Sequence, residues 1–238
     1  MIVLGLDTAT PQVGCALGDG DGPVASFHLS RGRRHAESLA PAIDHLCRQS
    51  GIGLDQLGAV AVDIGPGLFT GLRVGVATGK ALATALGVPM IGLTSLEIVA
   101  YPHRRGAGLI ASVIDARRSE VFWALFRGEE QVGECVVSTP EALASQLARQ
   151  DEEIVAVGDG AIRYAPLLAT IDGVELLGAG SAYPSAAVLV ELAQPRAAGG
   201  DLVAPGELTP LYLRQADVRI SWIERDRPIA AASMTEAG

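Results

Sequence analysis

The chain has 238 residues, of which 49% are hydrophobic and 4% aromatic, and its formal net charge is −9. This composition predicts an aliphatic core and excludes disorder, and the acidic balance disfavours tight RNA binding by this chain alone. Three widely spaced cysteines predict free thiols rather than disulfides or a zinc site. No signal peptide or membrane-spanning stretch is expected, which favours a cytoplasmic protein.

Apolar runs separated by turn residues predict a first series of elements. A helix is indicated at 35–49 by an apolar stripe at helical spacing, and another at 69–86 by its conventional stop at Gly87. The full series is three strands, a helix, a strand, a helix, a strand and a short helix, at 2–8, 13–18, 23–29, 35–49, 59–62, 69–86, 89–92 and 95–101.

A second, similar series follows. It consists of three strands, a helix, a strand, a helix, a strand and a helix, at 109–115, 121–126, 135–138, 140–149, 154–157, 161–169, 174–177 and 184–197. Repetition of a βββαβα unit predicts an α/β protein with the actin/Hsp70-like ATPase (ribonuclease H-like) fold. We expect residues 1–105 to form one lobe and residues 106–205 the other.

Two stretches could form a nucleotide or anion site. Asp7 and Thr8 end the first strand, where active ATPases of this fold present backbone N–H groups and an acidic residue to phosphates. Ala9 occupies a place where glycine is usual. The loop that contains Gly65, Gly67 and Thr70 lies between a strand and a helix, as an anion cradle does. A simple strand end satisfied by its own turn explains Asp7 and Thr8 equally well.

Small residues recur every fourth position of the predicted helix 69–86, at Gly71, Gly75, Gly79 and Ala83. Each interior glycine costs about 1 kcal/mol relative to alanine, so a helix that keeps three of them needs another backbone close by. The residues leave two explanations open, which are packing within the lobe and contact with a partner protein.

No metal or catalytic side-chain set can be assembled from the sequence. His35 begins the helix 35–49, but the position four residues later, where a second imidazole would share its face, is Leu39. A Ser/His/Asp or Cys/His set has no support from spacing. We therefore expect neither a metal site nor catalytic residues.

Several motifs together resemble the bacterial TsaB (YeaZ) family. They occur in family order along most of the chain: Ile2–Thr10, His35–Pro41, Gly65–Arg73, Gly92–Leu96, Asp115–Arg117 with Glu120 and Val121, and Pro210–Arg214. Leu68 departs from the serine that is usual in the family.

The resemblance implies a non-catalytic subunit that pairs with the paralogue TsaD, which forms threonylcarbamoyladenosine in tRNA next to the anticodon. It also implies a TsaE-like ATPase as a further partner, use of ATP by the complex, tRNA contact through the complex, and a homodimer when TsaD is absent. Residues 206–225 are expected to return to the first lobe. The family's interface uses the two helices of the first lobe, which favours a partner contact for the following residues: His35, Leu39, Ile43, Leu46, Phe69, Gly71, Leu72, Gly75, Gly79 and Ala83.

Three alternatives stay open. A stand-alone ATPase or phosphotransferase of the same fold predicts saturable ATP binding by the isolated chain. A peptidase, presumed to act on the paralogue, predicts cleavage of that protein on incubation. A structural dimer predicts a glycine stripe that serves internal packing alone.

Overall fold

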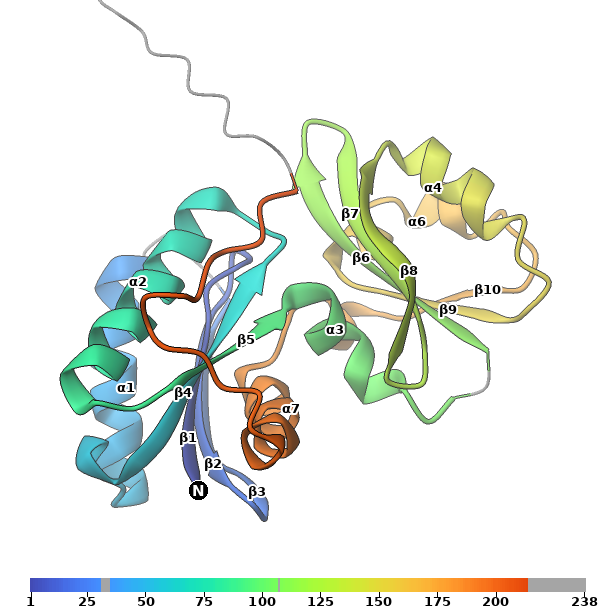
Figure 1. Ribbon diagram of the computed structural model, residues 1–238. Helices are drawn as coiled ribbons and strands as arrows, with labels where there is room; N and C mark the ends of the chain where they lie inside the picture. Colours follow the sequence, from blue (N-terminus) through green and yellow to red (C-terminus); the bar gives the residue numbers. More distant parts are fainter. Residues whose placement is uncertain (31–34, 107, 214–238) are drawn as a thin grey trace, which may run out of the picture.

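The computed structural model describes residues 1–30, 35–106 and 108–213, and it contains two lobes that lie side by side (Figure 1). Each lobe is built around a five-stranded sheet. The strands of the first sheet are β1 (Ile2–Asp7), β2 (Val13–Asp19), β3 (Gly22–Leu29), β4 (Leu57–Gly65) and β5 (Met90–Thr94). Those of the second are β6 (Leu109–Arg117), β7 (Glu120–Arg127), β8 (Glu130–Ser138), β9 (Ile154–Val157) and β10 (Val174–Leu176).

The two sheets have the same strand order. The first runs β3-β2-β1-β4-β5 and the second, read from the matching edge, β8-β7-β6-β9-β10. In each sheet the first three strands are antiparallel, and the last two are parallel to the first strand of the unit. The predicted duplication of a βββαβα unit is therefore confirmed.

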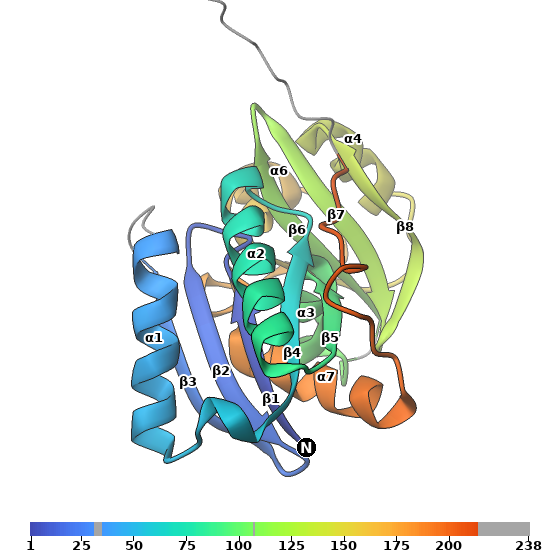
Figure 2. The same cartoon turned by 60° about the vertical axis from the view of Figure 1, so that its left-hand side comes forward.

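Helices cover both faces of the first sheet. Helices α1 (His35–Ser50) and α2 (Phe69–Leu86) pack on one face, and α7 (Ala186–Gly199) packs on the other (Figures 1 and 2). Because side chains alternate along a strand, β1 serves both layers: Leu4 and Leu6 join the core under α1 and α2, and Val3 joins the core under α7. Burial on both faces explains why β1 and β4 are continuous apolar runs.

The second sheet is covered in the same way. Helices α4 (Pro140–Leu147) and α6 (Ala165–Leu168) contribute Leu143, Leu147 and Leu168 to the core on one face. Helix α3 (Ser95–Ala100) contributes Leu96 and Val99 to the core on the other face, and α5 (Asp159–Arg163) follows β9. Helix α3 therefore belongs to the first repeat in sequence, yet it lies between the two sheets, with Leu96 and Val99 on the second and Ile98 in the core under α7.

One expected boundary is corrected by the position of α7. This helix was expected in the second lobe, but it lies against the first sheet. Gly5 on β1 makes this packing possible, since a Cβ there would lie 2.7 Å from Cγ2 of Val190 and 2.9 Å from Cδ2 of Leu189. The lobe predicted at 106–205 therefore lacks its last helix.

After α7 the described part of the chain runs along the first lobe as far as residue 213. Met90 and Val203 exchange two backbone hydrogen bonds of 2.9 Å, and Leu208 is buried in the core. The N–H of Leu211 donates to the carbonyl oxygen of Ile64 at 2.7 Å. This segment covers the β5 edge of the sheet beside α2 (Figure 2). Residues 214–225 of the expected returning segment lie outside the described residues.

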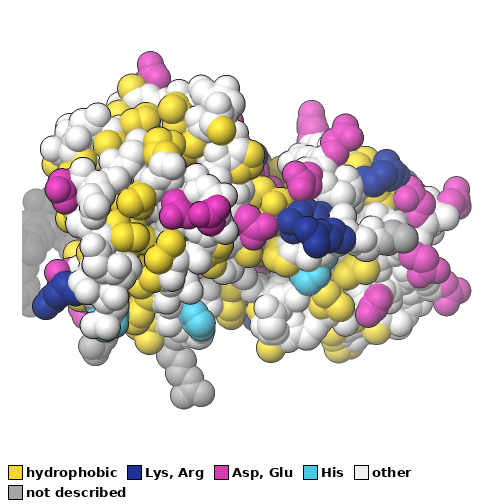
Figure 3. All heavy atoms as spheres, turned by 90° about the horizontal axis from the view of Figure 1, so that it is seen from below, with side chains coloured by type: hydrophobic (Ala, Val, Ile, Leu, Met, Phe, Trp, Pro, Cys, Tyr) yellow, Lys and Arg dark blue, Asp and Glu magenta, His cyan; other side chains and the backbone are white. Residues whose placement is uncertain are grey.

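Ion pairs join the lobes. Arg104, which follows α3, pairs with Glu191 on α7 at 3.2 Å and with Glu129 between β7 and β8 at 3.1 Å. Its guanidinium carbon lies 3.5 Å from the centre of the Tyr101 ring. Seen from below, Lys and Arg side chains gather where the two lobes meet, with acidic side chains beside them (Figure 3). These contacts tie α7 to the tip of the second sheet.

The three cysteines, all of them within the described residues, are free thiols, as predicted. Burial raises the pKa of Cys15 and that of Cys135 to about 12. Of the helices in the part of the chain that the structure describes, none has both the length and the apolar character needed to cross a bilayer.

Candidate functional site

Two carboxyl groups meet where β1 and β4 end. The parallel pairing of Leu6 with Val62 places Asp7 beside Asp63, and both side chains are buried. Oδ1 of Asp7 accepts a hydrogen bond from the N–H of Ala9 at 2.9 Å. Oδ1 of Asp63 accepts one from the N–H of Gly65 at 2.8 Å and one from Oγ of Ser95 at 2.6 Å. Each carboxyl group thus holds the turn that follows its own strand.

Burial changes the acidity of both groups. It raises the pKa of Asp7 well above its usual value, and the negative charge of Asp63 raises it further. Burial also raises the pKa of Asp63 to about 7, against the lowering effect of the hydrogen bonds from Ser95 and Gly65. The Oδ2 atoms of both residues are buried and receive no hydrogen bond from any other described group, while the two carboxyl groups interact with each other. The pair therefore favours a partly protonated state.

The turn after β1 is joined closely to the glycine-rich loop and to α2. Oγ1 of Thr8 donates to the carbonyl oxygen of Gly71 at 2.7 Å, and the N–H of Leu68 donates to the carbonyl oxygen of Ala9 at 2.7 Å. A Cβ at Gly71 would lie 2.0 Å from the carbonyl oxygen of Thr8, which no real side chain tolerates. Glycine is therefore required here for backbone to approach backbone.

The residues predicted to form an anion site come together but face inward. Asp7, Thr8 and Gly65 are buried, Gly67 lies against the carbonyl group of Ala9, and Thr70 is exposed on the first turn of α2. The hollow between this turn and the second lobe has no volume that a water molecule could occupy. It is lined by Ala9, Thr10, Pro11, Leu68, Ile114, Asp115, Arg117 and Asp159. Anion binding by these residues stays a prediction.

The glycine stripe of α2 is turned toward the protein's own sheet. Gly71, Gly75, Gly79 and Ala83 are all buried. A Cβ at Gly75 would lie 2.4 Å from Oγ1 of Thr8, and one at Gly79 would lie 2.6 Å from Cγ2 of Val62. The expectation that this stripe contacts a partner is therefore wrong, because β4 and the turn after β1 already occupy the space beside it.

The same correction applies to most of the other expected interface residues. Leu39, Ile43 and Leu46 of α1 belong to the core of the first lobe, and Leu72 of α2 is buried. His35 is buried too, with Nε2 2.8 Å from the carbonyl oxygen of Thr10. Phe69 alone among the expected interface residues is exposed, at 39% of its surface. The apolar stripe of α1 marks its core-facing side.

Phe69 belongs to an exposed cluster that the sequence did not predict. Its ring lies 5.3 Å, between centroids, from the ring of Tyr212, which is 43% exposed. The guanidinium carbon of Arg73 lies 3.9 Å from the centre of the Phe69 ring, and Nε of Arg73 donates to the hydroxyl of Tyr212 at 3.4 Å. We call these three residues the Phe69–Arg73–Tyr212 cluster.

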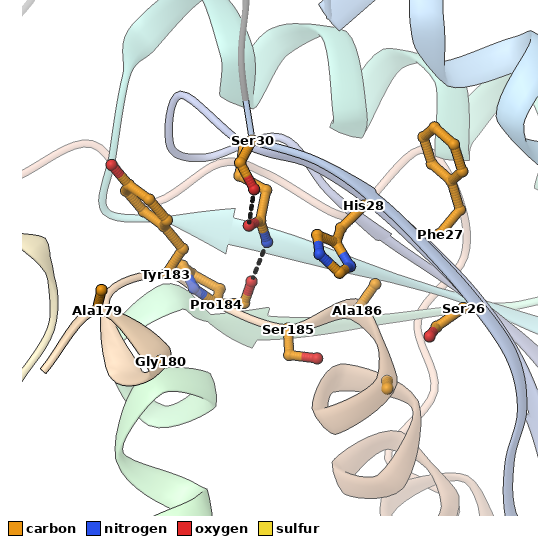
Figure 4. A pocket seen from close by; sticks show the side chains of 12 residues that line it. Ser26, Phe27, His28, Ser30, Ala179, Gly180, Tyr183, Pro184, Ser185 and Ala186 are labelled. Atoms are coloured by element: carbon orange, nitrogen blue, oxygen red, sulfur yellow. Dashed lines mark hydrogen bonds between the residues drawn. The ribbon is translucent and has the colours of Figure 1, made fainter.

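A separate hollow of about 470 Å³ lies between edge strand β3 and the start of α7 (Figure 4). Gln12 spans it, since its Nε2 donates to the carbonyl oxygen of Pro184 at 3.0 Å and its Oε1 accepts from Oγ of Ser30 at 3.3 Å. His28 and Tyr183 also line it. The sequence offered no signal for this hollow, because its walls come from distant parts of the chain.

Comparison with known proteins relates this geometry to a family. The model of the TsaD family, described as tRNA N6-adenosine threonylcarbamoyltransferase, matches residues 29–187. The tRNA threonylcarbamoyladenosine biosynthesis protein TsaB of Escherichia coli is 32% identical over an alignment of 231 residues, which covers 93% of this chain and 97% of that protein. The chain belongs to the TsaB family.

Solved structures agree with this family and with the predicted fold. YeaZ from Pseudomonas aeruginosa matches this TsaB-family chain with a TM-score of 0.76 and 29% identity, covering 89% of this chain and 99% of that one. An activator of 2-hydroxyisocaproyl-CoA dehydratase from Clostridium difficile, solved with ADPNP, matches with a TM-score of 0.52 at 11% identity, covering 89% of this chain and all of that one, 100%. That likeness concerns the fold alone, which is the expected actin/Hsp70-like ATPase fold.

Proposed function

We propose that this TsaB-family chain is a non-catalytic subunit that pairs with a TsaD-like threonylcarbamoyltransferase and activates it, for threonylcarbamoyladenosine formation in tRNA. Its relatives in Escherichia coli and Bacillus subtilis are named for tRNA threonylcarbamoyladenosine biosynthesis. A TsaE-like ATPase is proposed as a further partner, with ATP used by the complex and tRNA reached through it. When the TsaD-like partner is absent, we expect a homodimer.

The main support for a non-catalytic role is that the turn after β1 uses its polar groups for hydrogen bonds within its own lobe. In active ATPases of this fold, backbone N–H groups and an acidic residue at the first turn serve phosphates. Here Oδ1 of Asp7 accepts from Ala9, Oγ1 of Thr8 donates to Gly71, and Leu68 closes on Ala9. These polar groups of the turn are thus engaged within the lobe, with Oδ2 of Asp7 as an exception, and the hollow that described residues line between the turn and the second lobe has no room for a water molecule.

The outward sides of α1 and α2 are the proposed surface for the partner. The two helices lie side by side on the first lobe, and the described residues place no other element over their outer faces (Figure 2). Along α2, Arg73, Ala77 and Ala81 are exposed at intervals of four residues and lead from the Phe69–Arg73–Tyr212 cluster. Methyl side chains let a partner helix approach closely, and an aromatic–arginine group is typical of the residues that dominate binding energy.

Ala81→Arg tests the proposed surface. We expect this variant to fold normally, since Ala81 is exposed, but to lose co-purification with the TsaD-like protein, because a long charged side chain separates the two surfaces. Threonylcarbamoyladenosine formation in tRNA by the co-expressed pair should fall in parallel. Size-exclusion chromatography and nucleoside analysis of the tRNA measure the two effects.

A matched control is Ala169→Arg, which introduces the same side chain at an exposed alanine of the second lobe. This control should pair and function like the unchanged chain. Full co-purification of a folded Ala81→Arg variant would show that the partner does not use this face of α2.

A further inference from the structure

The Asp7–Asp63 pair has a property that pairing with another protein does not explain. Each Oδ1 atom already holds a backbone amide, and each Oδ2 atom is buried without a donor from any other described group. Two ionised carboxylates side by side in a buried site would repel each other strongly, and neither outer oxygen would accept a hydrogen bond from another described group. One proton on one of the outer oxygens makes that O–H group a hydrogen-bond donor, and the outer oxygen of the other, ionised carboxylate accepts the bond.

We infer that Asp7 and Asp63 bind one proton between their outer oxygens, and that this proton fastens the glycine-rich loop to the turn after β1. Asp63 already accepts hydrogen bonds from Ser95 and Gly65, which stabilise its ionised form. Asp7 accepts only one, from Ala9. The O–H group therefore belongs to Asp7, and it donates to the carboxylate of Asp63.

The charged group that acts on the pair from the neighbouring helix is Glu97 of α3. Its negative charge raises the pKa of Asp63, so it also favours retention of the proton. Glu97 is itself held by Oγ1 of Thr94, which donates at 2.9 Å, and by Arg196 of α7 at 2.6 Å. The cation on α7 is thus paired with Glu97.

The remaining charged or titratable groups nearby are engaged elsewhere. On α1, His35 contacts the carbonyl oxygen of Thr10. On α2, Arg73 lies over the Phe69 ring, and at the end of β6, Arg117 pairs with Asp115 at 2.8 Å. Because these groups have partners of their own, the shared proton compensates the buried charge.

The sign of the pH dependence follows from the raised pKa values of the two carboxyl groups. The folded protein binds the proton more tightly than the unfolded chain, so the stabilisation is complete below the ordinary pKa of 3.8 and is lost as pH rises through the raised pKa of Asp7, above the value of about 7 for Asp63. Loss of the proton leaves two repelling carboxylates beneath the loop that leads into α2. The loop should therefore loosen before the rest of the lobe does.

The decisive experiment measures denaturant unfolding of the full chain at intervals between about pH 5 and about pH 9, so that the range extends above the pKa of Asp63. We compare how steeply the equilibrium constant for unfolding rises with pH in the unchanged chain and in Asp63→Asn. Loss of one bound proton should make this constant rise by up to an additional tenfold per pH unit in the unchanged chain. In Asp63→Asn, the amide donates to Asp7 without any proton. Asp172→Asn, at an exposed carboxylate of the second lobe, should keep the unchanged chain's profile.

Two further readouts keep the inference testable if Asp63→Asn does not fold. The infrared C=O band of a neutral carboxylic acid should be present in the unchanged chain near pH 6 and absent from Asp7→Asn. Amide exchange at Gly65 and Leu68, corrected for intrinsic rates, should accelerate with pH in the unchanged chain. Parallel unfolding profiles for the unchanged chain and Asp63→Asn, or no carboxylic acid band, would overturn the inference whether or not a partner binds.

Discussion

Gly71→Ala is expected to destabilise the first lobe by about 3 kcal/mol, although alanine is the better helix former. The new methyl group would lie 2.0 Å from the carbonyl oxygen of Thr8 and 3.2 Å from its carbonyl carbon. Both are backbone atoms of the turn after β1, so no side chain can swing away to relieve the overlap. Moving α2 outward would also break the hydrogen bond from Thr8 to Gly71.

Urea unfolding followed by circular dichroism measures this effect. Ala77→Gly is the matched control, because it exchanges the same two residue types on the exposed side of the same helix. Its expected cost is about 1 kcal/mol, from helix propensity alone. If Gly71→Ala were as stable as the unchanged chain, the close approach of α2 to the turn after β1 would be contradicted.

Phe69→Ala is expected to weaken binding to the TsaD-like partner by about 30-fold or more, which corresponds to about 2 kcal/mol. Truncation removes the ring that Arg73 and Tyr212 both contact. The Phe69–Arg73–Tyr212 cluster therefore loses the contacts that position its side chains as well as apolar surface. Calorimetric titration of the partner measures the loss. The stability of the isolated chain should change little, since the Phe69 ring is substantially exposed.

Ile162→Ala serves as the control for Phe69→Ala. Ile162 is 37% exposed, close to the 39% of Phe69, but it lies on α5 in the second lobe. This control should bind the partner with unchanged affinity. Equal affinities for Phe69→Ala and the unchanged chain would remove the Phe69–Arg73–Tyr212 cluster from the proposed interface.

The two predictions for α2 together separate its inner and outer faces. A substitution at Gly71 should act on folding, and one at Phe69 on association. Both sites lie within the first turn of the same helix. The difference between their expected effects therefore depends on which face of the helix each residue occupies, and not on its place in the sequence. Ala81 extends the outer face toward the other end of the helix.

Local signals in the sequence were sufficient for most of the elements and for their duplication, but the single helix predicted at 161–169 is two short helices, α5 and α6. Helix α2 begins and ends at the predicted residues. Its end is predictable because Gly87 adopts a φ of +68°, a conformation that favours glycine after the last turn of a helix. Apolar runs with tight turns likewise predicted the order of the strands. Strand β8 is longer than predicted, since it continues through Gly133 with a φ of +81°, where the apolar pattern is interrupted.

Only the tertiary structure decided what each face meets. Helical spacing shows that Gly71, Gly75 and Gly79 share one side of α2, but a bare stripe fits a strand of the same lobe as well as a partner helix. The contact of Arg73 with Tyr212 joins residues separated by 139 positions, and α7 crosses back to the first sheet. Such contacts depend on how complete elements pack, which local propensities do not encode.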